Sequence, residues 1–156
     1  MIGNDIVDLE QAKKESNWKR KGYLEKIFTP GERFLISAAK DAEMMVWLLW
    51  TMKESAYKIF SRENKIRVFA PAAIVCNNLI IHKKTATGNV WYQEQSYFTK
   101  TSITERYVHT LAAADASLLQ KIRYKISSYD ACDSSYRATN PGSVSHHGIY
   151  LALAYL

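Results

Sequence analysis

The sequence predicts an α+β domain in which an antiparallel sheet packs against a long central helix. The main observation is the stretch over residues 42–62, which is apolar on nearly every face between Met44 and Met52 and therefore marks a buried helix. After that helix, short apolar segments separated by turn residues predict several consecutive strands. The length of 156 residues fits a single domain over residues 1–156.

Capping and turn residues place the individual elements. Thr29, Pro30 and Glu32 have the residue types and spacing of a helix start, with Thr29 as the N-cap. Asp41 is a candidate N-cap for the central helix. In the first part of the chain we expect a short strand over residues 1–9, a broken surface helix over 10–26, a helix from Thr29 to about Lys40 and the central helix over 42–62. After it we expect strands over 66–81 around Pro71, a turn at 87–89 into a strand from Val90, and strands at 96–103 and 106–114. A long loop over 127–142 and a final strand over 148–156 complete the expected order.

The composition is that of a globular protein, with 47% hydrophobic and 12% aromatic residues. A net charge of +6 suits an acidic partner, which could be nucleic acid, anionic lipid, a phosphorylated cofactor or an acidic protein. Cys76 and Cys132 share no metal-type spacing, and we expect two free thiols in a reducing compartment. The chain start lacks the features of a signal peptide, and the longest apolar run is too short to span a membrane, so a cytoplasmic location is expected.

Two carboxylates stand in apolar surroundings. Asp5 interrupts a strand-like opening, and Glu54 lies one helical turn beyond an apolar segment. Hard cations such as Mg²⁺ take oxygen ligands, so two remote carboxylates that meet in the fold can supply such a site. The alternative is that Asp5 caps a turn and Glu54 pairs with Lys58 at the i, i+4 spacing. Spacing alone favours this alternative, whereas the apolar neighbourhood of Glu54 favours a bound partner.

Two further segments allow several interpretations. Ser145, His146 and His147 precede the last expected strand, where they suit a phosphate site, a structural role or, less well, a zinc site. Zinc is disfavoured because no other histidine, cysteine or carboxylate stands at a recognisable ligand spacing. The basic stretch from Lys13 to Lys26 is compatible with a solvated helix face, with nucleic-acid binding or with docking of an acidic protein.

Three segments together resemble the 4′-phosphopantetheinyl transferases. They are Gly3-Asn4-Asp5, the helix segment Trp50-Thr51-Met52-Lys53-Glu54-Ser55-Ala56-Tyr57-Lys58, and Ser145-His146. The family pattern is Gly-x-Asp followed by Trp/Phe-x-x-Lys-Glu-Ser/Ala-x-x-Lys. The order of the motifs and the short chain resemble the small holo-acyl-carrier-protein synthase type. Because members of that type are trimers with active sites between subunits, the resemblance implies a homo-oligomer, specifically a trimer.

The resemblance implies a Mg²⁺-dependent transfer of the phosphopantetheine arm of coenzyme A to a serine of an apo acyl carrier protein, with release of 3′,5′-ADP. It gives Glu54 and Lys58 catalytic roles, because Glu54 would help to deprotonate the serine and Lys58 would stabilise the leaving pyrophosphate. It also implies that Asp5 and Glu54 ligate Mg²⁺ and that Lys53, Lys58, Ser145 and His146 bind the cofactor, with His146 a candidate for the 3′-phosphate.

The chain departs from the family pattern at two positions. Val7 stands where the longer type has a second acid, and Asp8 follows one residue later, so a site with two carboxylates is expected. Gln11 stands where the small type usually has a basic residue, so Lys13 or Lys14 would contact the carrier protein.

Two other functions stay open at this point: a non-catalytic relative that binds coenzyme A or a carrier protein, and a small basic protein that binds nucleic acid. The sequence does not identify a carrier protein of fatty-acid, polyketide or peptide synthesis. It also does not distinguish coenzyme A from acyl-coenzyme A.

Overall fold

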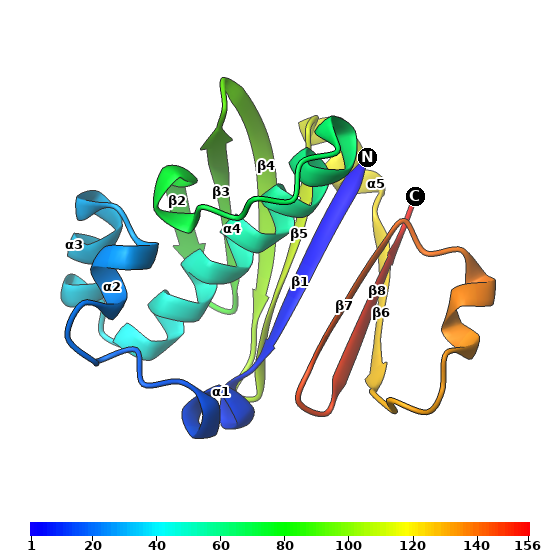
Figure 1. The fold of residues 1–156 in the computed structure, drawn as a ribbon, viewed down its shortest axis with the longest axis horizontal. Helices are drawn as coiled ribbons and strands as arrows, with labels where there is room; N and C mark the ends of the chain where they lie inside the picture. The colour runs from blue at the N-terminus through cyan, green and yellow to red at the C-terminus, as the bar shows by residue number, and fades with distance from the viewer.

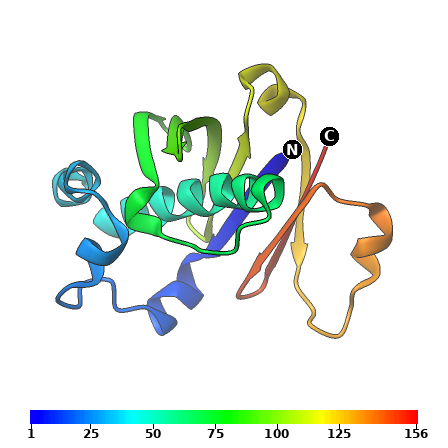
Figure 2. The same cartoon turned by 45° about the horizontal axis from the view of Figure 1, so that its top comes forward.

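The computed structural model describes residues 1–156. It contains two antiparallel sheets, one long helix and several short helices (Figures 1 and 2). The elements are β1 (Ile2–Asp8), α1 (Leu9–Glu15), α2 (Tyr23–Ile27), α3 (Pro30–Ala38), α4 (Ala42–Asn64), the 3₁₀ helix η1 (Pro71–Ala73), β2 (Val75–His82), β3 (Thr85–Tyr92), β4 (Gln95–Ile103), β5 (Tyr107–Ala113), α5 (Ala116–Lys121), β6 (Arg123–Ser128), the 3₁₀ helix η2 (Ser135–Thr139), β7 (Ser143–His147) and β8 (Tyr150–Tyr155).

The larger sheet has the strand order β1-β5-β4-β3-β2, and the smaller sheet has the order β6-β8-β7. Helix α4 packs on the larger sheet, chiefly against β1 and β5, while the smaller sheet lies beside β1 (Figure 1). This arrangement confirms the predicted fold class. No helix combines the length and the apolarity that crossing a bilayer requires.

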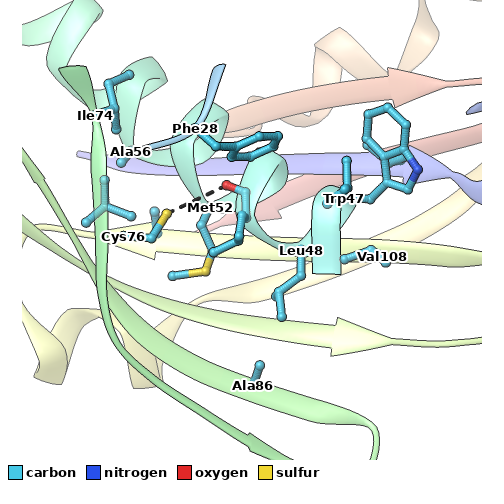
Figure 3. Packing of buried hydrophobic residues seen from close by; sticks show 14 of the residues in the cluster. Phe28, Trp47, Leu48, Met52, Ala56, Ile74, Cys76, Ala86 and Val108 are labelled. Carbon is cyan, nitrogen blue, oxygen red and sulfur yellow. Dashed lines mark hydrogen bonds between the residues drawn. The ribbon is translucent and has the colours of Figure 1, made fainter. Parts of the chain in front are cut away.

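The central helix forms where its sequence predicts. The Asp41 carboxylate accepts a hydrogen bond from the Met44 N–H at 3.0 Å, and the helix ends at Lys65, whose φ of 56° is left-handed. Leu48, Met52 and many other apolar side chains of α4 are buried in the core against the sheet (Figure 3). Burial on nearly every face explains the lack of a polar stripe in this part of the helix.

The start of α3 is also as predicted. The Thr29 hydroxyl accepts from the Glu32 N–H at 3.2 Å, and the Glu32 carboxylate accepts from the Thr29 N–H at 3.0 Å, which completes a capping box. Both cysteines are free, with Cys76 buried and Cys132 exposed.

The predicted turn at residues 87–89 is wrong, because these residues lie inside β3 and pair with β4. The chain turns instead between β2 and β3, where Lys83 has a φ of 57°. Gly88 serves close packing, since a Cβ at this position would lie 2.8 Å from the Met52 methyl carbon. The segment 66–70 forms no strand, so only the second part of the range 66–81 was predicted correctly.

The C-terminal part is more regular than its composition suggests. Strand β6 extends into the expected loop over 127–142, and η2 lies within the remainder. Ser143–His147 is itself a strand, β7, which forms a hairpin with β8 through Gly148 at a φ of 54°. Helix α5 and strands β6 and β7 were not predicted.

The two sheets meet along the free edge of β1, where side chains replace a strand partner. Because β5 pairs with β1 on one side, alternate N–H groups of β1 point to the other side and need acceptors. The acceptors come from every second residue of β7, and the distances are 2.9 Å from Asn4 N to Ser143 Oγ, 3.1 Å from Ile6 N to Ser145 Oγ and 2.9 Å from Asp8 N to His147 Nδ1.

Gly3 allows β1 to lie directly on α4. A Cβ at this position would lie 2.0 Å from the backbone oxygen of Ser55, which leaves no room for any side chain. The Ser55 hydroxyl in turn donates to the backbone oxygens of Thr51 at 2.6 Å and Thr110 at 3.2 Å. The backbone of α4 is therefore held against both β1 and β5.

We predict that Gly3→Ala lowers the free energy of unfolding by about 1–3 kcal/mol, because the new methyl group forces β1 away from α4. Urea denaturation measures this loss. Gly31→Ala is the matched control: a Cβ at Gly31 meets no atom within 4 Å, and alanine favours the helix. Equal effects of the two substitutions would show that the close contact is unimportant.

Candidate active site

A cavity of about 440 Å³ lies between α4, β1, β7 and the segment from α1 to α2, and we call it the cleft. Four side chains on one face of α4 line it, at the three- and four-residue spacings of a helix. They are Trp47, Trp50, Glu54 and Lys58. The other polar residues that line the cleft are Asp5, Glu15, Ser16, Tyr23, Ser145, His146 and His147.

Asp5 and Glu54, which are 49 positions apart in the sequence, both line the cleft. Burial and the neighbouring Asp5 carboxylate raise the pKa of Glu54 from 4.5 to about 7, although Lys58 acts in the opposite direction. The Glu54 carboxylate accepts no hydrogen bond and has no ion-pair partner within 4.0 Å, because the nearby Lys58 pairs with Asp5. The structure therefore places Glu54 where it can change its protonation state near neutral pH.

Only one oxygen of Asp5 is engaged. Its Oδ1 accepts from Lys58 Nζ at 3.1 Å and from the Ser145 hydroxyl at 2.8 Å, whereas its Oδ2 has no hydrogen-bond partner. Lys58 also donates to the Asn4 backbone oxygen at 2.8 Å. The alternative interpretation from spacing is thus wrong, because Asp5 lies inside β1 and Lys58 pairs with Asp5 instead of Glu54.

Asp8 does not reach the cleft. Its Oδ1 accepts from the N–H groups of Glu10 and Gln11 and so caps α1, while its Oδ2 accepts from Ile149 N at 3.1 Å. Gly148 makes room for this carboxylate, since a Cβ at Gly148 would lie 2.1 Å from Asp8 Oδ2. Asp8 is therefore a structural residue. The two carboxylates that remain near Lys58 in the cleft are those of Asp5 and Glu54.

These two carboxylates fit a hard divalent cation. No group of three or more histidine, cysteine, aspartate or glutamate side chains is arranged to hold a metal ion. Mg²⁺ does not need such a group, because it commonly binds one or two carboxylates and completes its shell with water and substrate phosphates. A cation would use the open Oδ2 of Asp5. It would also offset the burial and the neighbouring Asp5 charge that together raise the pKa of Glu54.

The serine and histidines of β7 have distinct environments. Ser145 links the strands, because its hydroxyl accepts from Ile6 N and donates to Asp5. His147 is fully engaged, with Nδ1 2.9 Å from Asp8 N and Nε2 3.0 Å from Glu15 Oε2. His146 lines the cleft, but neither of its ring nitrogens has a hydrogen-bond partner.

The pairing of His147 with Glu15 at the cleft was not predicted from the sequence. Hydrogen bonds from Gln11 and His147 lower the pKa of the Glu15 carboxyl. The spacing of Ser143, Ser145 and His147 was the available signal, since it is the period of one strand face.

The structure corrects the expectation that Lys53 lies along the nucleotide. Lys53 is fully buried and points away from the cleft, toward α2, α3 and η1. Its Nζ lies 2.7 Å from Glu32 Oε1 and donates to the backbone oxygens of Ile27 and Pro71 at 2.8 Å each. Lys53 faces this direction because it lies about 100° around the helix from Glu54.

Lys13 and Lys14 lie on the exposed side of α1, outside the cleft. They border a second cavity together with Arg106. Their ion pairs, with the half-buried Glu43 and the exposed Glu10, lie at the surface and are weak. The side-chain amide of Gln11 donates a hydrogen bond to the Glu15 carboxylate at 2.7 Å. Unlike the two lysines, Gln11 is therefore already engaged within its own helix.

The sequence matches a known protein family. The model of the 4′-phosphopantetheinyl transferase superfamily matches residues 1–112 of the chain. This range contains Asp5, Glu54 and Lys58, whereas β7 lies beyond it. A comparison with individual curated proteins finds no match.

We predict that Lys53→Met lowers the free energy of unfolding by about 3–5 kcal/mol, because it leaves the Glu32 carboxylate buried without a cation. Urea denaturation measures the loss. Adding Glu32→Gln should recover part of it, since glutamine keeps an oxygen for the Thr29 N–H without the charge. A loss below about 1 kcal/mol for the single variant would contradict the assignment of Lys53 to a structural ion pair.

The pKa of Glu54 predicts a pH dependence of stability. Its value near 7 in the folded protein exceeds the ordinary 4.5, so the folded state holds this proton more tightly than the unfolded state. Stability due to this group is therefore greatest below pH 4.5 and falls as the pH rises to about 7.

Glu54→Gln should remove this slope and be more stable than the unsubstituted protein at pH 8 by about 1–2 kcal/mol, a reduced figure because water screens the half-buried group. Urea denaturation at pH 4.5 and pH 8 without divalent cations measures the difference. The exposed Glu10→Gln is the control, and identical pH profiles for all three proteins would refute the prediction.

Proposed function

The chain belongs to the 4′-phosphopantetheinyl transferase superfamily, and on this premise we propose that it transfers 4′-phosphopantetheine from coenzyme A to a serine of an apo acyl carrier protein. The observation that carries the proposal is the convergence of Asp5, Glu54 and Lys58 in one cleft. We assign the chain to the small holo-acyl-carrier-protein synthase type, because its Ser-His segment follows the other motifs.

Asp5 and Glu54 are the residues that would hold Mg²⁺ in this proposal. When bound, the ion would supply Lewis-acid stabilisation and a template for the pyrophosphate. Ser145 supports this site by donating to Asp5 Oδ1, which leaves Oδ2 for the metal. Ser145 therefore acts through Asp5 in this proposal, which refines its expected role as a direct contact of the nucleotide.

Glu54 acts as the proton acceptor. Without a metal, burial and the neighbouring Asp5 carboxylate raise the pKa of Glu54 to about 7. A bound cation would favour its ionised form, which is the form that can accept a proton. The serine oxygen forms a bond to the phosphorus that carries the pantetheine arm, the bond from that phosphorus to the bridging oxygen breaks, and the serine proton passes to Glu54. The products are the phosphopantetheinyl serine and 3′,5′-ADP.

Lys58 stabilises the leaving group. Its ammonium has three N–H donors, and the Asn4 backbone oxygen and Asp5 Oδ1 take two of them. The third remains for an oxygen of the pyrophosphate, where negative charge increases during the displacement. Because the other two bonds fix the ammonium beside Asp5, Lys58 needs little reorganisation to act.

Lys13 and Lys14 would contact the carrier protein. Their exposed side of α1 is adjacent to the cleft, since Ala12 and Glu15 of the same helix line it. An acidic partner that docks there would bring its serine close to the carboxylates. We further propose that the protein acts in the cytoplasm as a homo-oligomer, specifically a trimer, as implied by the small type.

Intact-protein mass spectrometry of an apo acyl carrier protein, incubated with this protein, coenzyme A and Mg²⁺, tests the reaction. We predict a gain of one phosphopantetheine that EDTA prevents. Glu54→Gln should reduce the rate by on the order of 10²-fold or more, because it removes the base and a metal ligand. Glu94→Gln is the matched control, since this exposed carboxylate lies in the turn between β3 and β4 and does not line the cleft.

Two results would contradict the proposal. The first is no mass gain with several folded carrier proteins despite coenzyme A binding, which would favour a binding protein without transferase activity. The second is a Glu54→Gln variant with near-normal turnover, which would exclude Glu54 as the base even if the protein is a transferase.

A further inference from the structure

The segment over residues 129–142, between β6 and β7, is held at both ends against β8 and its turn. Tyr129 N donates to the Ile149 backbone oxygen and Gly142 N to the Ala154 backbone oxygen, each at 2.8 Å. Between these ends, the hydroxyls of Thr139 and Tyr155 lie 2.8 Å apart. The segment is thus fixed to the sheet that contains β7.

The first residue of this segment, Tyr129, stacks on His146. The ring centroids are 4.0 Å apart and the planes differ by 8°, which is a parallel stack, whereas the other aromatic pairs are tilted or edge-on. His146 is exposed and makes no hydrogen bond through its ring, unlike the adjacent His147, which uses both nitrogens. The Tyr129 ring is therefore the contact that fixes the orientation of this imidazole.

This orientation matters because His146 lines the cleft. An imidazole with both nitrogens free can donate a hydrogen bond to an anionic oxygen in either protonation state. A ring that is already ordered before the ligand binds reduces the entropic cost of binding. No other side chain of the cleft combines an unpartnered ring nitrogen with an aromatic stack.

We propose that Tyr129 is a positioning residue, which holds His146 at the rim of the cleft so that the imidazole binds a phosphate of the nucleotide half of coenzyme A. This inference rests on the proposed function and gives the segment 129–142 a part in it. Tyr129 itself need not touch the ligand, because its effect passes through His146.

Calorimetric titration with 3′,5′-ADP and Mg²⁺ tests the proposal through a double-mutant cycle. His146→Ala should weaken binding about tenfold or more, and Tyr129→Ala about three- to tenfold. The double variant should bind as weakly as His146→Ala alone, because Tyr129 has nothing left to position. Tyr129→Phe should retain full affinity, and Tyr136→Ala, a tyrosine of the same segment with no aromatic partner, should have no effect.

An independent measurement reports the stack without any ligand. In the proton NMR spectrum, the ring current of Tyr129 should shift the His146 imidazole signals upfield, and Tyr129→Ala should abolish this shift while Tyr129→Phe preserves it. An absent shift, or additive losses in the double-mutant cycle, would overturn the positioning role. A normal shift in a protein that binds no 3′,5′-ADP would instead overturn the proposed function.

Discussion

The contact between Gly3 and the backbone of Ser55 is the constraint on which the site depends. Only a glycine lets β1 approach α4 so closely, because the Ser55 oxygen occupies the space of any Cβ. Asp5 lies two residues further along the strand, on the same face as Gly3. On the helix, Glu54 directly precedes Ser55. The Gly-x-Asp and Lys-Glu-Ser segments are therefore the two sides of one contact, which places their carboxylates together.

The opposite edge of β1 connects this contact to the end of the chain. Side-chain acceptors from β7 satisfy its N–H groups, and α4 supplies donors to its carbonyls through Lys58 and Arg62. Such bonds remove the cost of unpaired backbone groups without a continuous sheet. Because Ser145 bonds both the Ile6 N–H and Asp5, the same serine that joins the sheets also orients a carboxylate of the site. Fold and site thus share these interactions.

Local signals were sufficient for some features and insufficient for others. The capping box at α3 and the burial of α4 depend on residues close in sequence, so they could be predicted. Glu32 also forms a buried ion pair with Lys53, which was not predicted. Its role in the capping box already accounted for a glutamate at this position, so nothing in the sequence pointed to a distant partner. Gly88 misled for a related reason: glycine signals a turn, but here it accommodates Met52, a contact between distant elements. The position of β7 likewise depends on its partner strands.

Charge in the cleft links the raised pKa of Glu54 to the proposed metal. Asp5, Glu15 and Glu54 all line the cleft, whereas Lys58 is its one lysine, so adding a polyanionic cofactor would bring like charges together. Two changes would relieve this repulsion: protonation of Glu54, or a divalent cation held by Glu54 and Asp5. Protonation would serve in the absence of the cofactor. The cation would serve when pyrophosphate is bound, because pyrophosphate oxygens would complete its coordination shell. In the proposed reaction, cofactor and metal would therefore favour each other's binding, and the cation would return Glu54 to the ionised form that a base requires.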